Sequence, residues 1–173
     1  DTIDYSNLSS KITLVLEDSG ATTSVKVGNT TSDHTISNIE NIYGSTVADE
    51  ITGNNQSNTI LGYAGDDTID GGEGADYLDG GAGVNTISFK SFTSSVTVNL
   101  STNSSGETGE TILNFRNILG TDNSSQSDTL IGNNDANKIE GLAGNDTLEG
   151  LGGNDTLDGG NGNDVFILRA NDG

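Results

Sequence analysis

Acidic and amide side chains recur at every ninth position in two stretches of the chain. In full, this column holds Asp49, Asn58, Asp67, Asp76 and Asn85, and then Asn137, Asp146, Asp155 and Asp164. Carboxylate and amide oxygens are ligands for hard divalent cations. A period this regular predicts that a repeated structure brings these oxygens together.

The column belongs to a nonapeptide repeat that begins with glycine. Units start at residues 44, 53, 62, 71 and 80, and again at residues 132, 141, 150 and 159. Most units have a second glycine at position 4, and all have a large apolar residue at position 8: Ile51, Ile60, Ile69, Leu78, Ile87, Ile139, Leu148, Leu157 and Phe166. Glycine at this frequency opposes a helix. We therefore predict that each unit is a turn followed by a short strand. Two units would make one coil, with inward apolar side chains stacked about 4.8 Å apart.

A larger repeat encloses the nonapeptides. Residues 37–44 resemble residues 113–120, and three further segments resemble one another: 1–5, 85–89 and 164–168. We predict an all-β fold, a right-handed parallel β-roll or β-helix that forms one continuous solenoid and is an excerpt from a longer array.

Two cassettes are expected within this solenoid. The first covers residues 1–84 and the second covers residues 85–173. Each is predicted to begin with wide coils and to end with nonapeptides, with wide coils over 1–43 and 85–119 and nonapeptides over 44–84 and 120–167.

Composition excludes several kinds of protein. The 173 residues include 26 acidic and 6 basic side chains, a net charge of −20, with one His and no Cys. Disulfide frameworks, zinc fingers and multi-histidine metal centres are therefore excluded. An acidic surface repels phosphates, which argues against a nucleic-acid partner. No apolar run approaches the roughly 20 residues of a transmembrane helix.

The acidic column needs a counter-charge if the coils stack. Residues 18 apart would become neighbours, which pairs Asp49 with Asp67, and Asp146 with both Asp128 and Asp164. Like charges a few ångströms apart repel each other. Calcium would reverse this repulsion, because it accepts about six to eight oxygens, including backbone carbonyls that glycine turns can aim inward. Magnesium fits less well because it demands a stricter octahedron. An EF-hand is rejected because Tyr77 occupies the place of its bidentate Glu.

These units resemble the RTX nonapeptide, GGxGxDxUx, of calcium-binding parallel β-rolls. The resemblance implies that several Ca²⁺ ions lie between turns on the same side of the roll. It implies side-chain ligands at Asp49, Asn58, Asp67, Asp76, Asn85, Asp128, Asn137, Asp146, Asp155 and Asp164. It implies carbonyl ligands at Gly62, Ala64, Gly72, Gly74, Gly81, Gly83, Gly141, Ala143, Gly150, Gly152, Gly160 and Gly162.

Departures from the family pattern predict unequal sites. Asn58, Asn85 and Asn137 replace the acid, and sites that depend on them should be weaker or empty. The stretches 1–43 and 89–119 contain no recognised calcium motif.

The larger cassette resembles units of type I-secreted bacterial surface proteins and adhesins. We therefore expect an extracellular or cell-surface location and a structural role, as a spacer or assembly module that folds and stiffens on extracellular calcium. The partners expected are calcium, neighbouring copies or the rest of the array, and surface glycans. Two alternatives stay open: a non-catalytic tail of a secreted protease, lipase or alginate epimerase, and a carbohydrate-binding adhesin face. Catalysis is not expected, because His34 stands in a polar loop and the repeat already explains Asp66 and Asp67.

Overall fold

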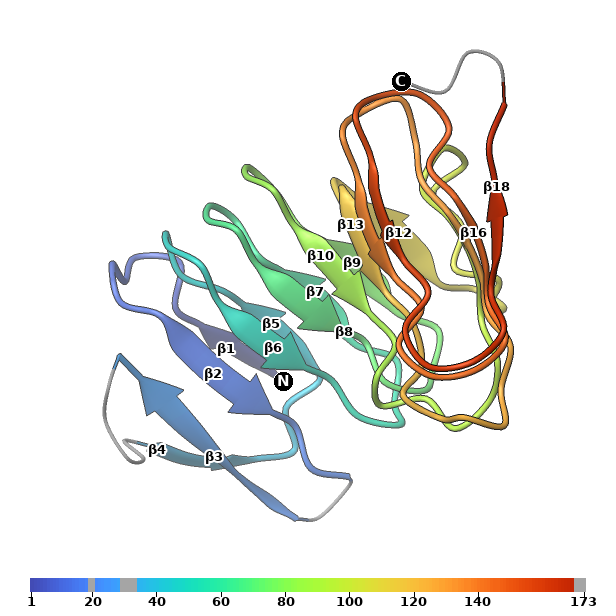
Figure 1. The fold of residues 1–173 in the computed structure, drawn as a ribbon. Helices are drawn as coiled ribbons and strands as arrows, with labels where there is room; N and C mark the ends of the chain where they lie inside the picture. The colour runs from blue at the N-terminus through green and yellow to red at the C-terminus, as the bar shows by residue number, and fades with distance from the viewer. Residues whose placement is uncertain (19–20, 29–33, 170–173) are drawn as a thin grey trace.

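The chain folds into short β-strands arranged as a solenoid. The computed structural model describes residues 1–18, 21–28 and 34–169, in which there are 18 strands and no helix (Figure 1). It follows that the described residues include no helix able to cross a membrane. This architecture confirms the predicted all-β parallel roll.

The strands form three sheets. The first sheet has the order β1 (Thr2–Asp4), β5 (Asn41–Tyr43), β7 (Thr59–Leu61), β9 (Tyr77–Asp79) and β12 (Thr111–Leu113). The second has the order β17 (Thr156–Asp158), β15 (Lys138–Glu140), β13 (Asn117–Leu119), β10 (Thr86–Ser88), β8 (Thr68–Asp70), β6 (Glu50–Thr52), β2 (Ile12–Val15), β3 (Thr22–Val27) and β4 (His34–Ser37). The third has the order β11 (Thr97–Asn99), β14 (Thr129–Ile131), β16 (Thr147–Glu149) and β18 (Val165–Ile167).

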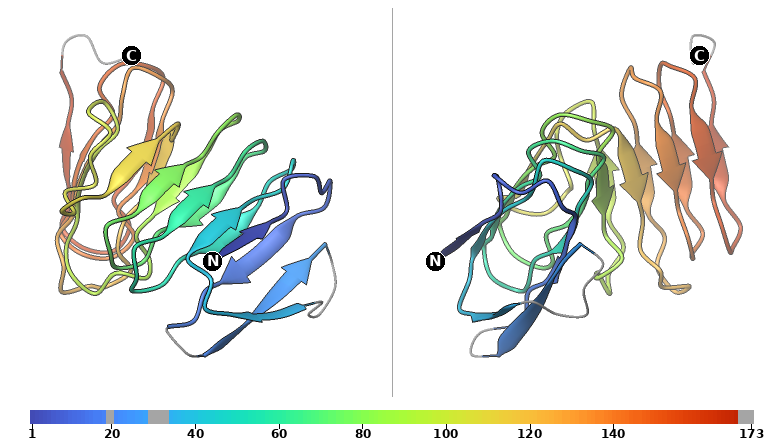
Figure 2. Two further views of the ribbon diagram at one scale, coloured as in Figure 1. Left: turned by 180° about the vertical axis from the view of Figure 1, so that it is seen from behind. Right: turned by 90° about the vertical axis from the view of Figure 1, so that its left-hand side faces the viewer.

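Two rolls share the second sheet. From β5 to β10 the chain alternates between the first and second sheets, and from β13 to β18 it alternates between the second and third. Within the regular part, parallel neighbours are one 18-residue coil apart, as in the pairing of Thr59 with Tyr77. Figure 2 shows the successive coils lying side by side from one end of the molecule to the other. Same-side turns therefore stack, as the period of nine predicts.

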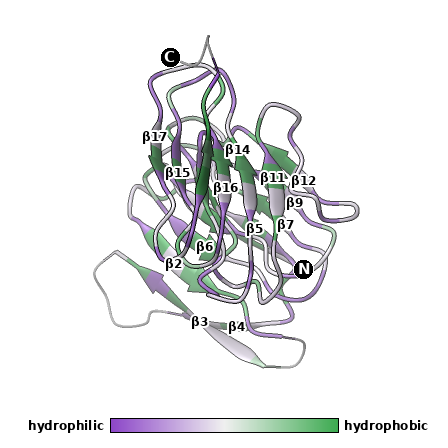
Figure 3. Cartoon of the chain, turned by 45° about the vertical axis from the view of Figure 1, so that its right-hand side comes forward, coloured by the Kyte–Doolittle hydropathy of each residue, from purple (hydrophilic) through white to green (hydrophobic). Residues whose placement is uncertain are grey.

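The core is a set of ladders made by the position-8 side chains. Ile60 pairs with Leu78 across the first sheet, and Ile69 pairs with Ile87 across the second. All four side chains are fully buried. Burial of one such side chain contributes about 1.5–3 kcal/mol. In Figure 3 the hydrophobic colour is concentrated on the strands, while the turns are largely hydrophilic.

The wide coils depart from the regular roll in two ways. In the first cassette, β2, β3 and β4 form an antiparallel meander, with Ile12 opposite Val27 and Val25 opposite His34. The expectation of wide coils over residues 1–43 did not include these antiparallel strands. The meander adds two strands at one end of the second sheet, where β2 would otherwise leave its backbone groups unpaired.

The second wide coil contributes a strand to each sheet. Between β10 and β13, both in the second sheet, the chain adds β11 to the third sheet and β12 to the first. The similar segments 1–5, 85–89 and 164–168 contain β1, β10 and β18, which lie in the first, second and third sheets respectively. The three similar segments therefore lie in three different sheets.

Candidate metal centres

Glycine-rich turns stack along the edges of both rolls. We number four stacks: stack 1 (turns 44–49, 62–67 and 80–85), stack 2 (53–58 and 71–76), stack 3 (132–137 and 150–155) and stack 4 (120–128, 141–146 and 159–164). Each turn ends at the acidic or amide residue of position 6, just before a strand. The strand register therefore aligns the position-6 residues of adjacent coils.

Hydrogen bonds link the position-6 residues directly. The backbone N–H of one residue donates to Oδ1 of its equivalent 18 positions later, as from Asp49 to Asp67 at 2.8 Å. The same bond joins Asn58 to Asp76, Asp67 to Asn85, Asp128 to Asp146, Asn137 to Asp155 and Asp146 to Asp164. All the neighbours expected from the sequence are thus brought together, although their role as ligands stays a prediction.

Three carboxylates of the stacks, in turns that follow another turn of the same stack, keep an oxygen without a partner. Oδ2 of Asp67, of Asp76 and of Asp146 is buried and receives no hydrogen bond, and each of these residues is at most 1% exposed. An isolated buried charge is costly unless a cation or donor compensates it. No described group of the protein compensates these oxygens, so they are suited to bind a cation.

Burial also changes how these groups bind protons. It raises the pKa of Asp67 and of Asp76 from 3.8 to about 6, and neighbouring carboxylates add to the rise. Burial raises the pKa of Asp146 as well, assisted by the charges of Asp128 and Asp164. Each shift means that the folded site opposes a bare negative charge.

Glycine at position 4 leaves the turns open to each other. A Cβ added at Gly83 would collide with the carbonyl oxygen of Gly65, and one added at Gly162 would collide with that of Gly144. Both glycines have positive φ, 142° and 138°. Carbonyl oxygens can therefore approach the neighbouring turn closely.

Three of the predicted carbonyl ligands face across a stack. A Cβ added to the first glycine of the preceding turn in the stack would lie 2.6–2.8 Å from the carbonyl oxygen of Gly62, Gly141 or Gly150. The described residues contain no group of three or more His, Cys, Asp or Glu side chains that could hold a metal ion. An ion in a stack would consequently take most of its ligands from carbonyls, as calcium does readily.

The three asparagines stand where a nonapeptide stack meets a wide coil. The amide Nδ2 of Asn58 donates to Glu40 O at 3.0 Å, that of Asn85 to Asn114 O at 3.1 Å, and that of Asn137 to Arg116 O at 2.8 Å. An amide donor here satisfies a carbonyl that would otherwise face a carboxylate. This arrangement supports the prediction that these positions bind an ion weakly or not at all.

The remaining position-6 acids differ from the three that keep a bare oxygen. Asp49 accepts hydrogen bonds from Ile12, Ser45 and the Ser45 hydroxyl, and Asp128 accepts from Val96 and Thr121. Both therefore receive donors on both oxygens, although burial still raises the pKa of Asp49. Asp155 and Asp164 lie in the last coil, partly exposed, and each accepts one backbone hydrogen bond from the coil before. The sequence pattern alone does not distinguish these classes.

Arg116 lies 3.9 Å from the carboxylate of Asp135, the position-4 residue that replaces glycine in its unit. His34 is exposed on β4, as expected of a surface residue.

Comparison with known proteins gives a family match: residues 52–87 and 131–166 match the model of a family described as the RTX calcium-binding nonapeptide repeat (4 copies). No curated protein matches the chain.

Proposed function

The chain carries RTX calcium-binding nonapeptide repeats in a parallel β-roll. We propose that it has a structural role, as a calcium-stiffened module of a secreted bacterial surface protein. Repeats of this family bind several Ca²⁺ ions. The observation that carries the proposal is the set of buried, unpartnered oxygens on Asp67, Asp76 and Asp146. They lie in stacked turns, where a cation would stabilise only the folded chain.

The proposed mechanism is folding coupled to ion binding. Without calcium, a net charge of −20 and the stacked carboxylates oppose the compact state. The chain's glycine-rich turns lose much conformational freedom on folding, which opposes it further. Bound calcium supplies positive charge and oxygen coordination between the turns. Since no such site exists in the unfolded chain, the binding free energy contributes to folding.

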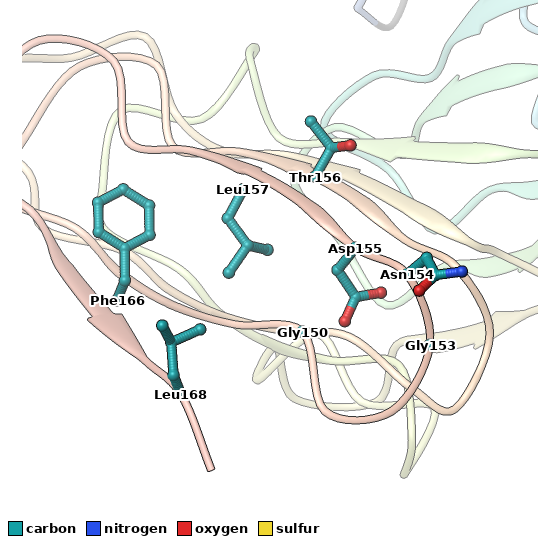
Figure 4. Close-up of a pocket in the computed structure, with 8 residues that line it drawn as sticks. All are labelled: Gly150, Gly153, Asn154, Asp155, Thr156, Leu157, Phe166 and Leu168. Atoms are coloured by element: carbon teal, nitrogen blue, oxygen red, sulfur yellow. The ribbon is translucent and has the colours of Figure 1, made fainter. Parts of the chain in front are cut away.

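The shape of the roll suits a spacer that joins similar units. Its C-terminal end is an open pocket of about 640 Å³ (Figure 4), in which Leu157, Phe166 and Leu168 turn apolar side chains toward one another. Phe166 is 45% exposed, whereas its ladder partner Leu148 is fully buried. Because β1 and β10, which have similar sequences, each pair with a strand of the next coil, we propose that β18 receives a further coil from the array or a neighbouring copy.

The test is a calcium titration followed by far-UV circular dichroism, starting from the chelated chain. We expect little β-signal in chelator and a cooperative rise as calcium is added, because the ions compensate the buried oxygens. Magnesium at the same concentration should produce a smaller rise. A full β-signal that is indifferent to chelation would contradict the proposed function.

Two aspartate variants provide the matched comparison. Asp146→Ala removes a middle carboxylate, whereas Asp135→Ala removes one whose nearest cation is the Arg116 side chain at the surface. Asp146→Ala should shift the calcium midpoint to higher concentration more than Asp135→Ala does. Equal shifts would show that the stacked column is not where the ions act.

A further inference from the structure

Resting on that proposed function, we propose that residues 105–113 are an additional, degenerate nonapeptide and that Glu110 and Asp76 together bind a divalent cation there. Residues 105–110 lie beside the last turn of stack 2. Residues 105–110 lie outside the segments that match the family model and outside the nonapeptides recognised from the sequence.

The strand register places Glu110 next to Asp76. Tyr77, Leu78 and Asp79 of β9 pair with Thr111, Ile112 and Leu113 of β12. The residue before each strand is the position-6 residue, so Glu110 takes the place that Asp76 takes one coil earlier. Gly109 follows the same alignment, because a Cβ added to it would lie 3.1 Å from the Cβ of Ala75.

The hydrogen bonds around Thr111 repeat those of a regular unit. Thr111 N–H donates to Asp76 O at 2.7 Å, and Tyr77 N–H donates to Asn58 O at 2.9 Å in the coil before. Both bonds join the first strand residue of one coil to the position-6 carbonyl of the preceding coil. Strand β12 therefore joins β9 in the same way as the strand of a nonapeptide joins the coil before it.

The local conformation also matches the nonapeptide. Gly106, at position 2, has a φ of 79°, close to the 78° of Gly72. Their neighbours differ, because a Cβ added at Gly72 would meet the carbonyl oxygen of Asn54 and one added at Gly106 would meet that of Thr97 on β11. Ile112, at position 8, is 1% exposed, like the fully buried Leu78. The unit escapes a motif search because Ser105 and Thr108 replace the glycines of positions 1 and 4.

The two carboxylates both lack a partner on one oxygen. Asp76 is 1% exposed and its Oδ2 receives no hydrogen bond, and Oε2 of Glu110 is likewise buried and unpartnered. No ion pair among the described residues includes either side chain. Two such groups one coil apart repel each other when both are ionised, and either a proton or a cation between them removes this repulsion.

The other edge of the first roll, where stack 1 meets the same wide coil, has a junction compensated by an amide. In stack 1 the last position-6 residue is Asn85, whose amide donates to the carbonyls of Gly81 and Asn114. Stack 2 ends instead in an acid, Glu110, that cannot donate when ionised. The junction of stack 2 with the wide coil therefore has a carboxyl group where the junction of stack 1 has an amide.

The donor set indicates a hard cation with carbonyl ligands. Asp70, the next acid, is already occupied by the hydroxyls of Ser88 and Ser91 and by two backbone N–H groups. Two carboxylates and turn carbonyls remain, a set composed of oxygen alone, while the Ser105 hydroxyl already hydrogen-bonds to Glu110. Such a set is typical of calcium.

Calcium stoichiometry tests the site directly. Glu110→Gln removes the charge with little change in size, and Glu107→Gln makes the same change at an exposed residue of the same segment. Isothermal titration and equilibrium dialysis should show one ion fewer per chain for Glu110→Gln, and an unchanged number for Glu107→Gln. An unchanged number for Glu110→Gln would overturn the proposed site.

The fold is monitored by circular dichroism at saturating calcium. Should Glu110→Gln not fold, Glu110→Asp replaces it: the shorter carboxylate should fold and bind one ion more weakly than the unchanged chain, and equal affinity for every ion would overturn the site. Failure of the wider function is distinguishable, since in that case the unchanged chain itself would bind no calcium.

Discussion

At the scale of single residues, the acids of the stacks that keep a bare oxygen are in the most unfavourable positions. Asp67 and Asp76 each give one oxygen to a backbone donor and keep the other buried and bare. Their environment opposes the ionised form, and two remedies exist: protonation or a cation. Protons and calcium should therefore compete for the same oxygens.

This competition predicts how pH affects the calcium-free chain. The pKa of Asp67 and of Asp76 is about 6 in the folded chain against 3.8 for an ordinary carboxyl group, so the folded state binds more protons than the unfolded state between these values. Stability is therefore greatest below pH 3.8 as far as these groups are concerned, and is lost as pH rises through 6. We expect the β-signal of the calcium-free chain to rise when pH falls from about 7 to about 5. A signal that falls on acidification would contradict this account of the two carboxyl groups.

At the scale of the turn and strand, glycine at position 4 allows coils to stack closely. Gly153 has a φ of 118°, and a Cβ there would collide with the backbone of Asp135 and Ala136. Gly152, at position 3, has no such contact with backbone, and its equivalents Ala64 and Ala143 already carry a Cβ. Two adjacent glycines thus face opposite requirements.

The pair Gly153→Ala and Gly152→Ala measures this difference. Gly153→Ala should lower the free energy of unfolding in calcium by about 1–3 kcal/mol, because the backbone must hold a strained φ and the next coil must move. Gly152→Ala should change it by less than about 0.5 kcal/mol. Urea denaturation at saturating calcium provides both values. Equal losses at the two positions would mean that contact between turns does not limit stacking.

At the scale of the whole molecule, three sheets and two rolls result from one repeated cassette. The second sheet runs through both rolls, while the first and third sheets each serve one. The segments that contain β1, β10 and β18 are similar in sequence and lie in the first, second and third sheets. The last coil exposes Phe166 where all earlier position-8 residues except Leu157 are buried. The proposed further coil or neighbouring copy would cover this side chain.

Association through the C-terminal end can be measured with two neighbouring substitutions. Phe166 faces the pocket of the last coil, whereas Val165 is not among the residues that line it. In calcium, Phe166→Asp should abolish concentration-dependent association and Val165→Asp should reduce it much less, because a buried charge is costlier than an exposed one. Sedimentation velocity distinguishes the two. Association that survives Phe166→Asp would place the contact elsewhere.

Much of the architecture follows from local sequence. The period of nine predicts the turns, the short parallel strands and the buried ladder of Ile and Leu, because glycine content and apolar spacing act within a single unit. The stacking of position-6 residues 18 apart follows from the same period. The matched repeats also support the predicted calcium ions.

Other features depend on contacts between distant segments. One is the antiparallel β2–β3–β4 meander, and another is the passage of the second wide coil through all three sheets. Both come from insertions whose lengths do not reveal which sheet they join. The compensation of Asp49 by Ser45 and Ile12, and the alignment of Glu110 with Asp76, likewise arise only when coils pack. The sequence alone determined that acids would line the turns. Tertiary structure decided which acids keep a bare oxygen, because hydrogen-bond partners come from neighbouring coils and not from neighbouring residues.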